Sequence, residues 1–175
     1  MKNSIFTIIT FIFLTVVSQG LNASEKDFRA QLSDLKNYQV NTGTMISSGL
    51  PSQAHFKIFK EMGITKVVDL IPGDRAEESN YVKTLGLAYY NIQVDWENPT
   101  VDNFSDYVSV MKQDPNTDGI TLTHCRLNWR GAVFTYLYRV TQLGESEEIA
   151  KRDLLDTWEP NTTWQDFIDK VKAQY

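Results

Sequence analysis

Residues 121–131 read Thr-Leu-Thr-His-Cys-Arg-Leu-Asn-Trp-Arg-Gly, and this stretch decides the fold. Its first part completes a short strand, residues 120–124, in which threonine alternates with apolar residues. A helical pattern follows over residues 133–140 after a brief loop. In open α/β sheets, ligands bind at the carboxyl ends of strands, where loops lead into helix N-termini. We therefore expect a ligand-binding loop around Cys125.

Outward from this loop, strand patterns alternate with helical patterns. The expected strands cover residues 45–50, 64–71, 87–94 and 120–124, the first of them as an edge segment. The expected helices cover residues 52–62, 76–85, 100–111, 133–143, 147–158 and 161–171, after a short helix with Phe28, Leu32 and Leu35. Such alternation implies a parallel sheet covered by helices. We expect an α/β three-layer sandwich with a central, mostly parallel sheet of about four strands and a helical C-terminal third.

Composition excludes several classes of protein. The chain has 175 residues and a formal net charge of −5, so it lacks the basic excess of a non-specific nucleic-acid binder. Hydrophobic residues make up 42% and aromatic residues 12%, which is ample for a packed core and excludes a disordered chain. We expect one globular domain that binds no nucleic acid.

The N-terminus has the pattern of a secretory signal peptide. Lys2 supplies a basic start, residues 5–17 form an uncharged apolar run, and small or polar residues lead to Ala23. The run is too short for a comfortable membrane span. We therefore expect a signal peptide over residues 1–23 and a domain over residues 24–175. The mature protein would be periplasmic or secreted, with no membrane segment.

Cys125 is the one cysteine of the chain, so it forms no internal disulfide. It is either a small buried residue at a strand end or a thiol kept for its reactivity. Backbone N–H groups and the dipole of the following helix form an anion cradle there, and the same field stabilises a thiolate. The guanidinium groups of Arg126 and Arg130 match a tetrahedral oxyanion. Together these groups suit attack on a phosphoryl group.

Residues 121–131 resemble the His-Cys…Arg signature of cysteine-based phosphatases, the protein tyrosine and dual-specificity superfamily. More narrowly, they resemble the bacterial non-classical branch that includes the phosphatase domains of β-lactamase-hydrolase-like proteins. Supporting stretches lie at residues 48–52, 67–70, 94–100 and 134–140. The resemblance implies a dual-specificity phosphatase fold, a phosphocysteine intermediate, and no metal or organic cofactor.

The resemblance also implies roles for individual residues. Cys125 is the nucleophile, Arg130 binds the phosphoryl group, and His124 orders the loop and helps to keep the thiolate. The general acid carries over to Asp95, which follows the preceding strand, with Glu97 as the alternative. The remaining loop residues are expected to bind substrate: Arg126, Leu127, Asn128, Trp129 and Gly131.

Two departures from the superfamily pattern matter. Four residues, instead of the common five, separate Cys125 from Arg130, and Asn128 stands near the usual glycine. The shorter spacing is a property of the non-classical branch and supports it. Gly131 stands where most members carry Ser or Thr, whose hydroxyl helps the thiolate to leave in the second step. We therefore expect slow release of phosphate from the phosphoenzyme.

Two other functions are compatible with this loop. Rhodanese-type sulfurtransferases use a cysteine persulfide in a similar backbone cradle, many with four intervening residues. A phospho-ligand binding module with weak catalysis is the second alternative. His124 and Asp95 favour an exported phosphatase that hydrolyses phosphate monoesters.

The partner of such an enzyme is a phosphorylated small molecule or a phosphoprotein. Phosphotyrosine, a nucleotide, an inositol phosphate and a small phosphate ester all remain open, and the sequence does not indicate an oligomeric state. Trp96 and Trp129 either line the mouth of the pocket or belong to the core.

Overall fold

The computed structural model describes residues 27–113 and 119–175. The chain divides into two compact units, residues 1–34 and residues 35–175. In the first unit, residues 27–31 are helical, which confirms the short helix expected there. The expected signal peptide lies outside the described residues. The second unit holds the sheet and the helices on which the site depends.

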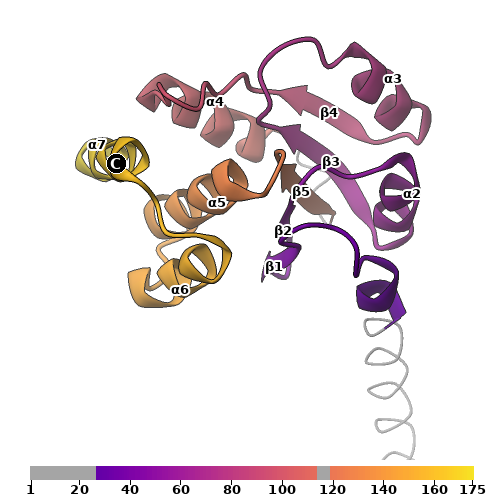
Figure 1. Ribbon diagram of the computed structural model, residues 1–175, viewed down its shortest axis with the longest axis horizontal. Coiled ribbons are helices and arrows are strands. Elements are labelled where there is room, and N and C mark those ends of the chain that lie inside the picture. The colour runs from indigo at the N-terminus through magenta and orange to yellow at the C-terminus, as the bar shows by residue number, and fades with distance from the viewer. Residues whose placement is uncertain (1–26, 114–118) are drawn as a thin grey trace, which may run out of the picture. The chain divides into compact units, whose positions relative to one another are not determined.

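The second unit is built on a five-stranded sheet in the order β1-β2-β5-β3-β4 (Figure 1). The strands are β1 (Gln39–Thr42), β2 (Met45–Ser48), β3 (Ile64–Asp69), β4 (Ala88–Asn91) and β5 (Ile120–His124). The β1–β2 pair is antiparallel, and the other three pairs are parallel. The expected α/β class with a mostly parallel sheet is confirmed.

The strand β1 was not predicted, and its presence corrects the expected four strands to five. It also means that β2 pairs on both sides instead of forming an edge. The reason is the pattern of burial in β1, where Asn41 is buried but Val40 is 45% exposed. Without apolar alternation, and with an irregular register between Val40 and Thr42, the segment carries no recognisable strand signal.

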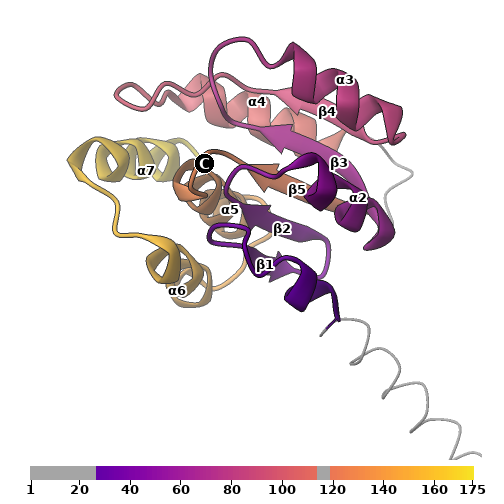
Figure 2. The ribbon, with the colours of Figure 1, turned by 45° about the vertical axis from the view of Figure 1, so that its right-hand side comes forward.

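Six helices surround the sheet in this unit: α2 (Gln53–Glu61), α3 (Ala76–Thr84), α4 (Val101–Lys112), α5 (Trp129–Thr141), α6 (Glu147–Thr157) and α7 (Thr162–Gln174). Figures 1 and 2 show α2 and α3 on one side of the sheet and α4 and α5 on the other. The helices α6 and α7 pack against α5 and not directly on the centre of the sheet. The three layers and the helical C-terminal third are as expected.

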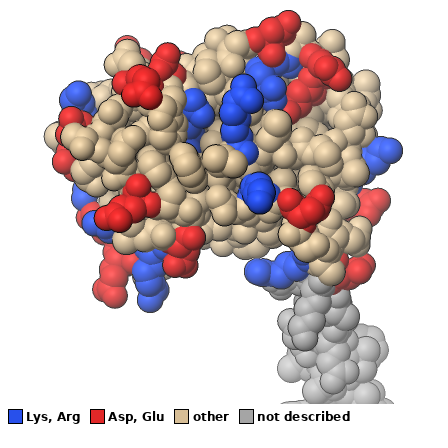
Figure 3. Space-filling view, in the orientation of Figure 1, with Lys and Arg blue, Asp and Glu red and all other residues tan. Residues whose placement is uncertain are grey.

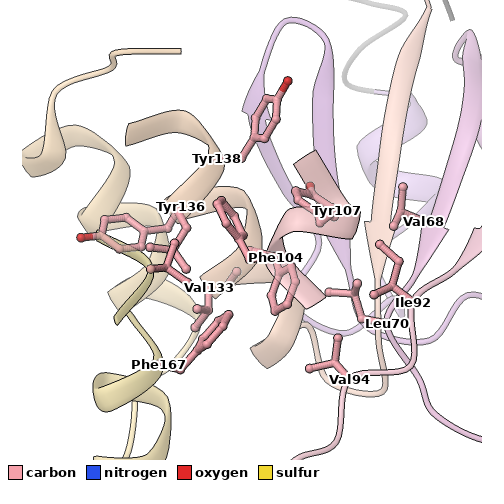
Figure 4. Packing of buried hydrophobic residues seen from close by; sticks show 14 of the residues in the cluster. Val68, Leu70, Ile92, Val94, Phe104, Tyr107, Val133, Tyr136, Tyr138 and Phe167 are labelled. Atoms are coloured by element: carbon pink, nitrogen blue, oxygen red, sulfur yellow. The ribbon is translucent and has the colours of Figure 1, made fainter. Parts of the chain in front are cut away.

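The core lies between the sheet and α5 (Figure 4). Phe134 of α5 packs edge-on against Phe104, with 6.0 Å between ring centroids, and stacks on Phe167 at 5.5 Å. Every residue of α5 from Arg130 to Arg139 is buried. The helix is therefore covered all round, by β2 and β5 on one side and by α4, α6 and α7 on the others.

Local capping explains where two helices begin. Ser52 accepts a hydrogen bond from the backbone N–H of His55, whose ring accepts one from the backbone N–H of Ser52. Thr100 and Asn103 make the same reciprocal pair at α4.

The surface mixes charges of both signs. On the face that Figure 3 shows, Lys and Arg side chains gather near the middle, and Asp and Glu side chains lie mostly around them. Within residues 27–113 and 119–175, no helix combines the length and the apolar character needed to cross a membrane.

Candidate active site

The parallel register brings the carboxyl ends of three strands together. Ser48 of β2 lies opposite His124 of β5, which in turn lies opposite Asp69 of β3. The loop that follows β5 then runs beside the loop that follows β2, because the Leu50 N–H donates to the Arg126 carbonyl at 3.2 Å. The Cys125 loop thus sits at the centre of the sheet edge, as expected for an open α/β fold.

Gly49 allows this close approach of the two loops. Its N–H donates to the Lys36 carbonyl at 2.7 Å. A Cβ atom at this position would lie 2.8 Å from the Cβ of Lys36 and 3.1 Å from the Arg126 carbonyl oxygen. Any larger residue would therefore push the β2 loop away from the Cys125 loop.

A pocket of about 220 Å³ opens on the Cys125 loop. Its lining consists of Trp96, Cys125, Arg126, Leu127, Trp129 and Arg130. The structure thus brings five of the residues proposed for the site around one cavity. Trp96, from the loop after β4, completes the wall, so both tryptophans weighed in the sequence line the pocket.

Cys125 is placed to act at the base of this pocket. Its thiol is free and only 1% of the residue is exposed, while its N–H donates to the Ser48 carbonyl at 3.3 Å. The helix α5 begins four residues later, and its N-cap residue, Asn128, makes no side-chain hydrogen bond to the first turn. The first N–H groups of a helix lack partners within it, so an anion beside Cys125 finds donors there.

Arg130 is held rigidly beside the same space. It is 8% exposed, and its Nε donates to the Val94 carbonyl at 3.0 Å. Its guanidinium carbon lies 5.3 Å from the centre of the Trp96 ring, in a cation–π contact. These two contacts fix the plane of the guanidinium. Its two terminal nitrogens can then donate to two oxygens of one oxyanion.

Asn128 anchors the loop from behind. It has a left-handed backbone with φ of 63°, a conformation that glycine and asparagine adopt more readily than other residues. Its Nδ2 donates to the Asn37 carbonyl at 2.7 Å and to the Ser47 hydroxyl at 3.0 Å. Asn37 in turn donates to the Leu127 carbonyl at 2.8 Å. The loop is therefore tied to β2 and to the segment before β1.

Gly131 is coupled to Asn128. A Cβ atom on Gly131 would lie 2.4 Å from Oδ1 of Asn128. That oxygen is buried and has no hydrogen-bond partner in the part of the chain that the structure describes. The absence of a hydroxyl residue after Arg130 therefore follows from the asparagine in the loop. Neither Asn128 nor Gly131, both proposed from the sequence to bind substrate, lines the pocket.

This coupling makes a double-variant cycle informative. We expect Gly131→Ser to lower the free energy of unfolding by about 1–3 kcal/mol, because its side chain overlaps the Asn128 carboxamide. We expect the double variant Asn128→Gly/Gly131→Ser to lose less stability than the sum of the two single variants, since glycine at position 128 removes the overlap, although it also removes the bonds to Asn37 and Ser47. Urea unfolding of the two single variants and the double variant measures the coupling; strictly additive losses would contradict it.

The proposed acid lies beside the pocket but not on its wall. Asp95 and Glu97 are both exposed, in the loop after β4. Oδ1 of Asp95 accepts a hydrogen bond from the Glu97 N–H at 2.8 Å, which holds the carboxylate in a local turn. The intervening residue, Trp96, is the one that lines the pocket. Catalytic contacts often tighten only when substrate is bound, so this geometry keeps both carboxylates as candidates.

His124 faces away from the pocket into a buried ionic network. Its Nε2 lies 3.1 Å from Oε1 of Glu78, and its Nδ1 lies 3.9 Å from Oδ1 of Asp69. Neither nitrogen makes an aligned hydrogen bond with the described residues. Arg75 joins the two carboxylates, with 2.6 Å to each, and the Tyr89 hydroxyl donates to Asp69 at 2.7 Å.

The same groups are near enough to one another to bind a cation. Asp69, Glu78 and His124 each offer a ligand atom, and these atoms lie within 4.8 Å of one another. The guanidinium of Arg75 already bonds to both carboxylates, however, and supplies the positive charge there. The network is therefore better described as an ionic support for His124 than as a metal centre.

Sequence analysis did not identify this network. Asp69 does give a signal, because it directly follows Val67 and Val68 and is buried at the end of β3. Its carboxylate accepts a hydrogen bond from the Ile71 N–H at 2.8 Å. Glu78 and Tyr89 give none, since they come from α3 and β4 and meet His124 or its carboxylate partners only in the folded chain.

The network predicts a pH dependence of stability. Burial alone raises the pKa of Glu78, but His124 and Arg75 outweigh it and lower the pKa from 4.5 to about 2. A lowered pKa in the folded state means that the contribution is present above pH 4.5 and is lost as the pH falls toward 2. The urea concentration at the midpoint of unfolding should therefore fall as the pH is lowered from 4.5 toward 2. We expect this fall to be smaller in Glu78→Gln, which lacks the titrating carboxylate.

The exposed neighbour offers a matched control. Glu77→Gln, one residue earlier on α3, should keep the pH dependence of the unmodified protein. A Glu78→Gln variant that loses stability in acid as steeply as the unmodified protein would show that Glu78 does not carry this dependence.

No protein-family model matches the chain, and no curated protein does. Solved structures do match. A DUF442 protein from Shewanella putrefaciens CN-32, assigned as a phosphatase, is 27% identical with a TM-score of 0.72, over 84% of this chain and 98% of that one. The core catalytic domain of the PP-IP phosphatase SIW14 from S. cerevisiae is 20% identical with a TM-score of 0.62, over 78% and 85%. TpbA from P. aeruginosa is 15% identical with a TM-score of 0.62, over 79% and 88%.

These neighbours share a fold with this chain, and they are phosphatases of the cysteine-based kind. The chain is thus similar to the cysteine-based phosphatases. The resemblance seen at residues 121–131 is thereby confirmed, and the likeness to the DUF442 protein supports phosphatase activity.

Proposed function

We propose that the chain is an exported phosphatase that hydrolyses phosphate monoesters through a phosphocysteine intermediate on Cys125. The observation that carries this proposal is the placement of Cys125 in the pocket, between the N-terminus of α5 and the fixed guanidinium of Arg130. The proposal that the protein is exported rests only on the signal-peptide pattern of residues 1–23.

In the first step, the Cys125 thiolate attacks phosphorus, an S–P bond forms and the bond to the ester oxygen breaks. The first N–H groups of α5 and the guanidinium of Arg130 bind the oxygens of the phosphoryl group and stabilise their negative charge in the transition state. The leaving oxygen takes a proton from a carboxylic acid, for which Asp95 is the first candidate and Glu97 the second. The products of this step are the free alcohol and the phosphoenzyme.

In the second step, water attacks phosphorus, its proton passes to the same carboxylate, and the S–P bond breaks to return the thiolate and phosphate. A neighbouring hydroxyl would stabilise that thiolate, and Gly131 supplies none. A hydrogen bond to a charged group contributes about 1.5–3 kcal/mol, so its absence slows this step by about ten- to a hundredfold. The phosphoenzyme therefore accumulates during turnover.

The role of Arg130 and Cys125 is tested by matched variants. We expect Cys125→Ser to abolish hydrolysis of an aryl phosphate, and Arg130→Lys to lower kcat/KM by about a hundredfold or more, because lysine cannot replace the two-point contact. Arg152→Lys on the exposed face of α6 serves as the control and should leave kcat/KM unchanged. Circular dichroism and thermal unfolding check that each variant is folded.

The same preparations separate the alternative functions. A sulfurtransferase would transfer sulfur from thiosulfate to cyanide, and Cys125→Ser would abolish that transfer. It would not hydrolyse the aryl phosphate. A binding module would take up phosphate or vanadate without turnover. Full aryl phosphatase activity in Cys125→Ser would overturn the proposed mechanism.

A further inference from the structure

A second hollow, of about 320 Å³, lies between α2 and α3. Its lining includes Phe56 of α2 and, at the start of α3, Arg75 and Glu78. The Phe56 ring packs edge-on against the ring of His124, with 6.1 Å between centroids, and Glu78 contacts the same ring from α3. None of these residues lines the pocket at Cys125. The hollow is therefore separated from His124 only by side chains that contact it.

The charges around His124 have an excess of one negative charge. Asp69 and Glu78 supply two carboxylates, and the guanidinium of Arg75 bonds to both. Tyr89 adds a neutral hydroxyl, because burial and its bond to Asp69 raise its pKa. A proton on His124 would neutralise the excess, and its ring nitrogens lie 3.1 and 3.9 Å from the two carboxylates. The network thus favours the positively charged form of the imidazole.

Glu78 makes the closer of the two carboxylate contacts to His124. Both oxygens of Asp69 accept hydrogen bonds from groups other than His124. Burial raises the pKa of Glu78, but His124 and Arg75 lower it to about 2, so Glu78 is ionised at neutral pH. Glu78 is therefore the carboxylate on which a charged His124 most depends.

The backbone leads from His124 directly to Cys125. The His124 carbonyl accepts from the Leu70 N–H at 3.0 Å, and the Cys125 N–H donates to the Ser48 carbonyl at 3.3 Å. The imidazole is fully buried and Cys125 is 1% exposed, so water screens little of the field between them. A positive charge beside a cysteine stabilises its thiolate. A charged His124 therefore favours the reactive form of Cys125.

His124 differs in one respect from the other positive groups near Cys125. Arg126 and Arg130 line the pocket, where the phosphate of a ligand partly neutralises them. His124 is not part of that lining. Its charge therefore acts on the sulfur both when the pocket is empty and when a ligand fills it.

We propose that Glu78 is a positioning residue, which keeps His124 in its charged form and thereby sets the pH range over which Cys125 is a thiolate. The resemblance to cysteine-based phosphatases implies that His124 helps to keep the thiolate, but it does not say what makes His124 able to do so. The proposal assigns this to a carboxylate of α3 that lies outside the pocket. It rests on the proposed function only because it takes the Cys125 thiolate as the nucleophile.

Alkylation by iodoacetamide measures the thiolate without any turnover. Cys125 is the one cysteine of the chain, so the rate of alkylation reports on it alone. We expect Glu78→Gln to raise the pH of half-maximal alkylation rate by about one unit. The rate near pH 6 should then fall by about tenfold, while the rate near pH 9 should hardly change. The acidic limb of kcat/KM for an aryl phosphate should move by the same amount.

Three matched variants make the result specific. Glu77→Gln removes an equal charge from the same hollow and should leave the alkylation profile unchanged. Tyr89→Phe removes a hydroxyl that bonds to both carboxylates but removes no charge, and should change the profile little. Glu78→Asp keeps the charge one methylene further from His124 and should give a smaller rise in the same direction. It keeps the proposal testable if Glu78→Gln does not fold.

The hollow also permits rescue by a small carboxylate. In Glu78→Ala, the hollow should extend toward His124 and Arg75, so that formate takes the place of the lost carboxylate. At constant ionic strength, we expect formate to recover much of the alkylation rate that this variant loses near pH 6. Formate should not raise the rate in the unmodified protein, in which Glu78 occupies the position.

The outcomes separate this inference from the proposed function. An unchanged alkylation profile in Glu78→Gln, or an equal shift in Glu77→Gln or Tyr89→Phe, would overturn the role of Glu78 and leave the phosphatase proposal intact. A loss of rate in Glu78→Ala that is the same with and without formate would assign the effect to packing and would also overturn it. The expected shift in a protein that hydrolyses no aryl phosphate would support the role of Glu78 and overturn the proposed function.

Discussion

Asn128 turns its side chain away from the pocket and into the body of the protein, where it bonds to Ser47 and to the Asn37 carbonyl. The shape of the Cys125 loop depends on this interaction. Because the carboxamide does not cap α5, the first N–H groups of that helix stay available for an anion. Because it fills the space beside Gly131, no hydroxyl residue fits after Arg130. The position of this one side chain thus links Asn128 to Gly131.

The site has two different environments on either side of the loop. Behind it, His124 contacts the carboxylates of Asp69 and Glu78, which the guanidinium of Arg75 bridges. In front of it, Trp96, Leu127 and Trp129 form an apolar wall of the pocket. Charged groups fix the backbone from which Cys125 extends, and aromatic groups face the ligand.

The sheet and helices were largely predictable because β3, β4 and β5 are rich in branched and aromatic residues, and because α2, α4 and α7 begin at capping residues. The strand β1 was not, since it is half exposed and polar. In the site, the lining from Cys125 to Arg130 was predictable because it is continuous in sequence.

The supports of the loop were not predictable in the same way. Asn128 bonds to residues 81 and 91 positions away, and Glu78 reaches His124 from another helix. Contacts of this kind depend on the register of parallel strands, which periodicity does not reveal. Trp158 at the end of α6 and Trp164 in α7 look like ordinary core residues in the sequence. Only the packing of the helices brings them behind Trp129 and Trp96.

The proposed mechanism requires that Cys125 becomes phosphorylated, and a slow second step would make the phosphoenzyme observable. The most direct measurement is acid quenching of the enzyme during turnover of an aryl phosphate, followed by peptide mass spectrometry. The account predicts one added phosphoryl group on the peptide that contains Cys125, absent in Cys125→Ser. A phosphoryl group on another residue, or full turnover with no covalent adduct, would contradict it.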